Sequence, residues 1–378
     1  MENKRKEILF FDNLRIKKGL SSLLSSVIAI LAGLLIGLVI LLATNFSEAF
    51  SGFFTMLLGG FNAGLKSFGN VFHMATPIIM TGLAVGFAFK TGLFNIGAPG
   101  QFITGSFVAV LIGVKLTQLG SIHWLVGILG AFIAGAIWGF IPGILKALLN
   151  IHEVISSIMM NYIGMFFVNF LIKRTILDVN TNRSLPVAAS ANMPKLGLNK
   201  IFPGSSINSG FLVAVLFVMI THIILNRTTF GYELKACGYN RFAAKYAGIN
   251  EVRSIILSMT IAGALAGMAG GLFYLSGAGV SINVVDVLAE HGFTGISVAL
   301  LGMSSPIGIL FSGLFIGWLQ IGGFYMQRYD FVPEFIQIIT AIIIYASAAS
   351  LLIRNYFETR RLNRKRFSKP QKEKGGNK

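Results

Sequence analysis

Long apolar runs recur along the chain, and each is close to the length that crosses a lipid bilayer as a helix. Such a helix needs about twenty mostly apolar residues to span roughly 30 Å of hydrocarbon, and the runs continue from residue 21 to residue 353 without a gap of soluble-domain length. The pattern predicts an all-α, polytopic bundle of about ten transmembrane helices. We expect them near residues 21–44, 71–90, 97–116, 122–149, 154–173, 209–226, 252–277, 288–303, 306–325 and 332–353.

The stretch 50–65 is also apolar, but Gly52, Gly59, Gly60 and Gly64 interrupt it. Irregular backbone at membrane depth is tolerated only where protein or a water-filled cavity surrounds it. We therefore expect a re-entrant or interfacial segment here rather than a span. A span at this point would invert the orientation of every later helix.

Glycines spaced four residues apart recur inside the predicted spans. They are Gly33 and Gly37, Gly82 and Gly86, Gly135, Gly139 and Gly143, Gly263, Gly267 and Gly271, and Gly313 and Gly317. This spacing puts the glycines of each set on one helix face, where they let a neighbouring backbone approach closely in lipid. We expect a tightly packed bundle.

The composition supports a single membrane domain over residues 21–353. Apolar residues make up 54% of the 378 residues and charged residues only 12%, against about 25% charged in a soluble domain. Residues 1–20 mix apolar and basic side chains, which suits a short amphipathic segment on the cytoplasmic leaflet. Residues 354–378 are expected to form a basic cytoplasmic tail.

The net charge of +17 would suit a nucleic-acid-binding surface, but the basic residues are placed differently. Six lie before residue 21 and ten lie between Arg354 and Lys378, directly beside apolar spans. With ten spans and a cytoplasmic amino terminus, 23 of the 31 Lys and Arg residues fall inside and 8 outside, as the positive-inside rule requires. We expect two cytoplasmic termini and no nucleic-acid partner.

The sequence offers no energy source for transport. No glycine-rich stretch ends in Gly-Lys-Ser or Gly-Lys-Thr, so it carries no phosphate-cradling loop. Proton- and sodium-driven carriers keep ionisable groups at mid-membrane, whereas the acidic residues here fall near span ends or in loops. A transporter built from this chain would take its energy from another subunit.

Residue patterns for catalysis or metal binding are also scarce. His152 and Glu153 begin like a zinc-protease helix, but serines stand where the second histidine would be. The five histidines show no metal-ligand spacing. Glu290 and His291 offer either an acid/base pair or a polar start to a helix. We expect no metal, no cofactor and no enzymatic activity.

Four segments beside the predicted spans have distinctive sequences that can be compared with known families. Residues 92–101 read Gly-Leu-Phe-Asn-Ile-Gly-Ala-Pro-Gly-Gln, with glycines that permit tight backbone and two amide side chains that can hydrogen bond. The loop 227–253 contains an Ala-Ala pair followed by a glycine. With residues 153–162 and 292–302, these segments resemble the branched-chain amino acid, ribose and nucleoside permease family of ABC importers, over about residues 70–350.

Within that family, the phrase Leu-Phe-Asn-Ile-Gly-Ala-x-Gly-Gln is similar to the simple-sugar and nucleoside branch, whose partners include a lipoprotein of the basic membrane protein type. One departure is Pro99, because that variable position usually holds Glu. The resemblance implies a type II ABC importer-like permease with two five-helix strings related by an inverted repeat. It also implies a second, usually different permease subunit, an ABC ATPase and an extracellular substrate-binding lipoprotein, all at the bacterial cell membrane.

The function that this resemblance implies is the channel-forming permease subunit of an ATP-driven nucleoside importer. A permease for ribose or another simple sugar stays open as the alternative, followed by a secondary carrier. A nucleoside has an aromatic base and a hydroxylated sugar, which aromatic faces and neutral amides suit better than charges. We therefore expect the substrate path beside Phe94, Asn95, Gln101, Asn161 and Phe293.

Coupling to the ATPase is expected in the loop 227–253, as one short helix from about Gly231 to Ile249 lying across the cytoplasmic face. The Ala-Ala pair and Ala247 would offer a small-residue surface that an ATPase groove can approach closely. The coupling residues implied by the resemblance are Gly231, Gly238, Ala243, Ala244 and Gly248.

Overall fold

The computed structural model describes residues 27–346, apart from 29, 333 and 344. The predicted amphipathic segment 1–20, the basic tail 354–378 and the outer ends of the first and last predicted spans lie outside the described residues. Most of the described chain is helical, and a short antiparallel pair of β1 (Leu177–Asp178) and β2 (Arg183–Ser184) lies between two of the helices.

Seven helices of the described chain are long and apolar enough to cross a membrane. They are α3 (Leu65–Lys90), α4 (Ala98–Lys115), α5 (His123–Leu149), α6 (Glu153–Thr175), α8 (Gly210–Arg227), α11 (Glu251–Tyr274) and α13 (Pro306–Met326). Each coincides with a predicted span. The first and last predicted spans are represented by shorter apolar helices, Ile30–Thr44 and Glu334–Ile343, so the total of ten stays a prediction.

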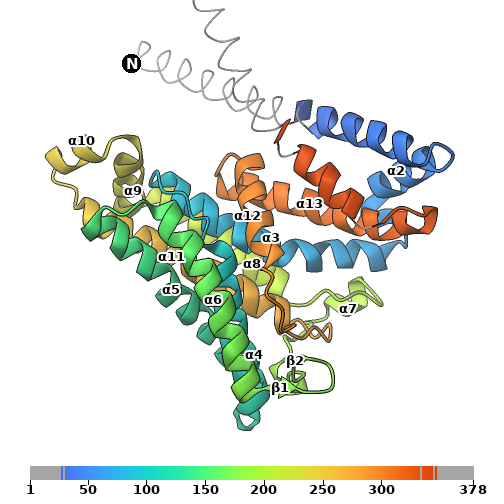
Figure 1. Cartoon of the computed structure of the whole chain (residues 1–378), viewed down its shortest axis with the longest axis horizontal. Helices are drawn as coiled ribbons and strands as arrows, with labels where there is room; N and C mark the ends of the chain where they lie inside the picture. The colour runs from blue at the N-terminus through green and yellow to red at the C-terminus, as the bar shows by residue number, and fades with distance from the viewer. Residues whose placement is uncertain (1–26, 29, 333, 344, 347–378) are drawn as a thin grey trace, which may run out of the picture.

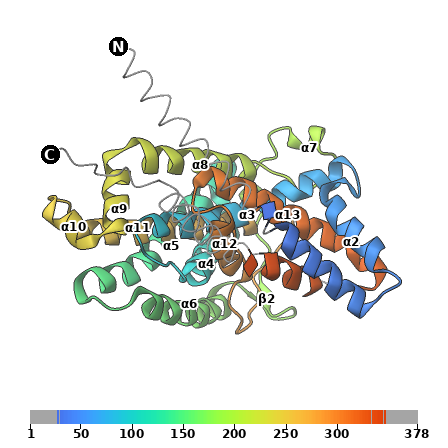
Figure 2. The same ribbon diagram turned by 90° about the horizontal axis from the view of Figure 1, so that it is seen from above.

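The remaining helices are short. They are α2 (Ala49–Leu58), η1 (Gly59–Phe61), η2 (Thr117–Ile122), η3 (Ala189–Ala191), α7 (Leu198–Ile201), α9 (Thr229–Tyr239), α10 (Arg241–Tyr246), α12 (Glu290–Leu301) and η4 (Gln327–Tyr329). α9 and α10 lie at one end of the bundle, far from β1, β2 and α7 (Figure 1). The view from above separates α10 from α7 in the same way (Figure 2).

The predicted span 288–303 is wrong as a complete helix. Its 12-residue helix α12 is only about 18 Å long at 1.5 Å per residue, well short of the hydrocarbon thickness. The residues before α12 form an irregular segment in which Gly277 and Gly279 have positive φ values. The helix ends where Met303 and Ser304 both adopt left-handed φ values of 54° and 51°, which non-glycine residues rarely do.

The glycine interruption predicted within 50–65 is confirmed. α2 has ten residues, and Gly59, with φ 45°, turns the chain beneath Trp318, whose indole N–H donates to the Leu57 carbonyl at 2.9 Å. Gly64 then takes φ 57° immediately before α3 begins. α2 is too short to span alone, so a re-entrant or interfacial position stays the prediction.

The tight packing expected from the glycine spacing is confirmed between α5 and α11. A Cβ added to Gly135 would lie 2.7 Å from the Cα of Gly267, and one added to Gly139 would lie 2.8 Å from the Cα of Gly263. Real Cβ atoms do not come this close, so the two helices meet backbone to backbone, as small residues allow in lipid. α11 also packs closely on α4 through Gly105.

Candidate functional site

The turn between α3 and α4 is held by a reciprocal amide pair. The Asn95 side chain donates to Gln101 Oε1 at 2.9 Å, and Gln101 Nε2 donates back to Asn95 Oδ1 at 3.1 Å. Both side chains are fully buried. Because a buried amide without partners is costly, this pairing explains why two amides can sit inside an apolar bundle.

Asn161, on α6, clamps the same turn from the side. Its Oδ1 accepts from the Gly100 N–H at 2.9 Å, and its Nδ2 donates to the Ile96 carbonyl at 2.9 Å. These bonds satisfy one backbone group at the start of α4 and another in the turn before it. We call Asn95, Gln101 and Asn161 the amide cluster.

Phe94 and Pro99 complete this turn by packing. The Phe94 ring stacks on Phe89, with centroids 5.3 Å apart and planes 11° from parallel. Pro99 occupies the first turn of α4, where proline is well tolerated, and it lies against Gly292 of α12: a Cβ there would be 2.7 Å from the proline Cδ. Pro99 therefore packs directly against the first turn of α12.

Phe293 does not belong to the amide cluster. It lines a hollow between α12, α13 and the helix Glu334–Ile343, made of two adjoining parts of about 180 and 200 Å³. We call this the α12 cavity. Its polar lining comes from Glu290, His291, Thr294 and Ser297 of α12, Gln320 of α13, and Gln337 and Thr340 of the last helix.

Bonding in the α12 cavity is incomplete. Gln337 donates to Glu290 Oε1 at 3.2 Å, but Gln320 makes no hydrogen bond within the described part of the chain. The neighbouring His291 ring stacks on Phe102 with centroids 5.4 Å apart. His291 is thus part of an aromatic stack, and no hydrogen bond joins it to Glu290 in the described chain. Both residues line the cavity, but they are held differently: Glu290 accepts from Gln337, and His291 is packed in the aromatic stack.

The predicted single coupling helix from Gly231 to Ile249 is wrong in form, because the structure divides it into α9 and α10. The break is at Asn240, whose φ of −159° is extended and whose side chain accepts from the Ala243 N–H at 3.0 Å. Thr228 caps α9 in the same way. An N-cap side chain satisfies a helix's unpaired N–H groups, so Asn240 ends one helix and starts the next. Gly248, with φ 82°, follows the end of α10.

The predicted coupling residues lie in different surroundings. Gly231 packs inward on Leu225 of α8, and a Cβ on Gly238 would lie 3.0 Å from the Gly92 backbone nitrogen. Ala244 is only 4% exposed, whereas Ala243 and Gly248 are exposed. The expected small-residue surface therefore does not include Ala244, which packs within the chain itself.

Large aromatic side chains dominate the free surface of α9 and α10. The exposed fractions are 69% for Tyr232, 91% for Tyr239, 76% for Phe242 and 95% for Tyr246. Exposed aromatic residues are enriched at protein interfaces. The sequence predicted a surface of small residues on this segment and did not predict the exposed aromatic side chains. In contrast, Cys237 of α9 is buried, and burial raises the pKa of its thiol.

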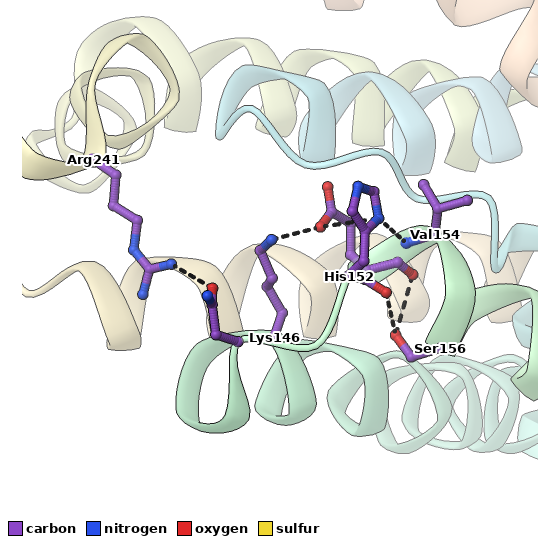
Figure 3. Close-up of polar contacts among 7 residues, drawn as sticks. Lys146, His152, Val154, Ser156 and Arg241 are labelled. Carbon is purple, nitrogen blue, oxygen red and sulfur yellow. Dashed lines mark hydrogen bonds and ion pairs between the residues drawn. The ribbon is translucent and has the colours of Figure 1, made fainter.

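One ion pair ties α10 to the start of α11, and a second joins the neighbouring helices α5 and α6. Arg241 Nε lies 2.6 Å from Glu251 Oε2 at the start of α11, and its guanidinium reaches towards the Asn150 side chain at 3.5 Å (Figure 3). Lys146 Nζ lies 2.9 Å from Glu153 Oε2 across the turn from α5 to α6. The two Arg241 contacts hold α10 against α11 and the α5–α6 turn, whereas the Lys146–Glu153 pair stabilises that turn itself.

The family model for "Branched-chain amino acid transport system / permease component" matches residues 67–348. The guanosine ABC transporter permease protein NupP of Bacillus subtilis is 39% identical over 302 residues, which are 80% of this chain and 86% of that protein. The nucleoside ABC transporter permease protein NupB of Lactococcus lactis is 39% identical over 76% of this chain and 80% of its own.

A third relative, the glucose ABC transporter permease protein TsgB13 of Haloferax volcanii, is 29% identical over 75% of this chain and 76% of its own. No solved structure matches. Since the family model covers most of the chain, the resemblance seen in the sequence is confirmed. The chain is a multi-pass membrane transport subunit rather than an enzyme, and it belongs to the branched-chain amino acid transport system permease family.

Proposed function

We propose that this chain is the channel-forming permease subunit of an ATP-driven importer and that its solutes are nucleosides. The observation that carries the proposal is the ranking of the relatives: two permeases named for guanosine or nucleosides share 39% identity with it, whereas one named for glucose shares 29%. A simple-sugar permease is the second candidate because of that glucose relative.

ATP hydrolysis is assigned to a separate ATPase subunit that docks on α9 and α10. Two features support this docking: the exposed aromatic surface, and the Arg241–Glu251 ion pair that fixes α10 to the start of α11. The coupling positions are Gly231, Gly238, Ala243, Ala244 and Gly248. Of these, the two exposed ones, Ala243 and Gly248, are proposed to contact the ATPase, and the others position the segment.

A second, different permease subunit is proposed to complete the channel. Bacillus subtilis has two proteins named as guanosine ABC transporter permeases, NupP and NupQ, which are 39% and 27% identical to this chain. An extracellular binding lipoprotein would deliver the solute. The assembly is proposed to lie in the bacterial cell membrane with both termini of this chain in the cytoplasm, as the charge distribution favours.

The substrate path is proposed to run beside Phe293 and along the turn that carries Phe94, Asn95 and Gln101, with Asn161 bracing that turn from α6. The amides of the cluster hydrogen bond to one another and to the turn rather than to a solute. Their proposed part in transport is therefore to fix the shape of the path wall.

Uptake by cells that contain or lack this chain tests the proposal. Radiolabelled purine and pyrimidine nucleosides, ribose and glucose are supplied separately, with the partner subunits unchanged. We expect ATP-dependent nucleoside uptake that disappears with the chain, and no change in sugar uptake. Loss of sugar uptake alone would favour the second candidate. Nucleoside uptake by this chain alone in liposomes without ATP would identify a secondary carrier instead.

A further inference from the structure

The α12 cavity lies at the depth of the spans rather than at their ends. Met74, in the interior of the 26-residue helix α3, lines it, and so does Gln320, which is fourteen residues into α13. α12 begins at this level, since Glu290 lines the cavity and Gly295 packs against Thr81 of α3. Helices that start inside a membrane protein typically border its binding site.

Polar side chains from three helices converge on this cavity. Those of two helices come from apolar settings: Gln320 stands in the run Leu-Phe-Ile-Gly-Trp-Leu-Gln-Ile-Gly-Gly, and Gln337 and Thr340 stand in the apolar last helix. Polar and ionisable groups inside membrane segments are costly and mark solute pathways by default. Ordinary packing would have placed leucine at such positions without loss.

The hydrogen-bonding capacity of the cavity is largely unused. The Gln320 amide offers one acceptor and two donors and has no partner within the described chain. Gln337 donates one N–H to Glu290, and its second N–H and its carbonyl make no hydrogen bond within the described chain. Thr294 and Thr340 donate their hydroxyls to backbone carbonyls of their own helices, which leaves their oxygens as acceptors.

We propose that the α12 cavity is a solute-binding station of the translocation path, in which Glu290, Gln320 and Gln337 hydrogen bond a neutral, hydroxyl-bearing solute and the Phe293 ring packs on its aromatic base. This inference rests on the proposed nucleoside function and deepens it. Ribose hydroxyls both donate and accept, so they match a carboxylate and two amides. No Lys or Arg lines the cavity within the described chain, so phosphorylated nucleosides have no cation to meet there.

Uptake of a nucleoside by the complete transporter tests the station with three matched substitutions. Gln320→Leu and Gln337→Leu remove amides from the cavity with little change in volume, and Gln327→Leu makes the same change at an exposed position just after α13. Losing a hydrogen bond to the solute corresponds to about a three- to tenfold effect. We expect that fall in the uptake rate for both cavity variants, with normal amounts of chain in the membrane, and no change for Gln327→Leu.

A second measurement does not depend on turnover. A cysteine placed at residue 337 by Gln337→Cys should react with a water-soluble maleimide and be protected by saturating nucleoside. Ile338→Cys, at the next residue of the same helix, is also exposed but does not line the cavity, and it should show no such protection. The native Cys237 is buried and contributes little background.

The outcomes separate the two proposals. If the unmodified transporter moves no nucleoside, the proposed function fails. If it does move nucleoside but both leucine variants match Gln327→Leu, or nucleoside protects neither cysteine, the station is wrong and the proposed function stands.

Discussion

The chain contains two groups of amide side chains with similar chemistry and opposite bonding. In the amide cluster, every member is buried and its hydrogen bonds are made to the cluster itself or to the turn it holds. In the α12 cavity, Gln320 has no partner in the described chain and Gln337 has one. A filled buried network specifies one conformation, whereas open groups around a cavity can bind a passing solute. Bonding state, rather than residue type, separates structural amides from transport amides.

The largest expected effect comes from Asn161→Leu. This change leaves the Gly100 N–H and the Ile96 carbonyl without their partners, and each orphaned buried group costs about 1–3 kcal/mol. We expect a marked fall in the thermal unfolding midpoint of the detergent-purified chain and less chain in the membrane. Asn226→Leu, on the exposed face of α8, is the control. Equal midpoints for the two variants would show that Asn161 does not hold the turn.

A double-mutant cycle on Asn95 and Gln101 should give a smaller and non-additive effect. Asn95→Leu or Gln101→Leu alone orphans the partner amide, which costs about 1–3 kcal/mol. Changing both leaves no orphan, so the loss for the double variant should fall below the sum of the single losses. Thermal unfolding midpoints of the four proteins measure this coupling. Strict additivity would mean that the two amides do not depend on each other.

The smallest effect on stability is expected in α9 and α10, where the exposed surface is proposed to contact the ATPase. Ala243→Glu changes an exposed residue and should alter stability by less than about 0.5 kcal/mol while reducing co-purification of the ATPase. Ala244→Glu, one residue further on, forces a carboxylate into buried packing and should lower the unfolding midpoint as well. Normal co-purification and uptake with Ala243→Glu would remove this surface from the proposed ATPase contact.

The sequence predicted the seven long helices well, because runs of about twenty apolar residues have few alternatives in lipid. It placed a helix correctly within 288–303 but not its length, since α12 has only 12 residues and is too short to span alone. It also failed at Asn240, although asparagine is a favoured N-cap and the break could have been predicted on that ground.

The candidate site was predictable only in part. Asn95, Gln101 and Asn161 were singled out together, and the structure does bring them together, but a sequence cannot tell whether amides face one another or a cavity. Gln320 and Gln337 were missed because each is a single polar residue in an apolar run, and their convergence depends on how α12, α13 and the last helix pack. The sequence did offer one indication of these residues, because an amide side chain within an apolar span is unusual.

The backbone-to-backbone contact between α5 and α11 has a mechanical consequence. Packing of long side chains can absorb a small displacement through rotamer changes, but a contact made by Gly135, Gly139, Gly263 and Gly267 has no side chains that can yield. α10 is fastened to the start of α11 through Arg241 and Glu251. If an ATPase docks on α10 as proposed, a displacement of α10 would pass to α11 through this ion pair and to α5 through the rigid glycine contact.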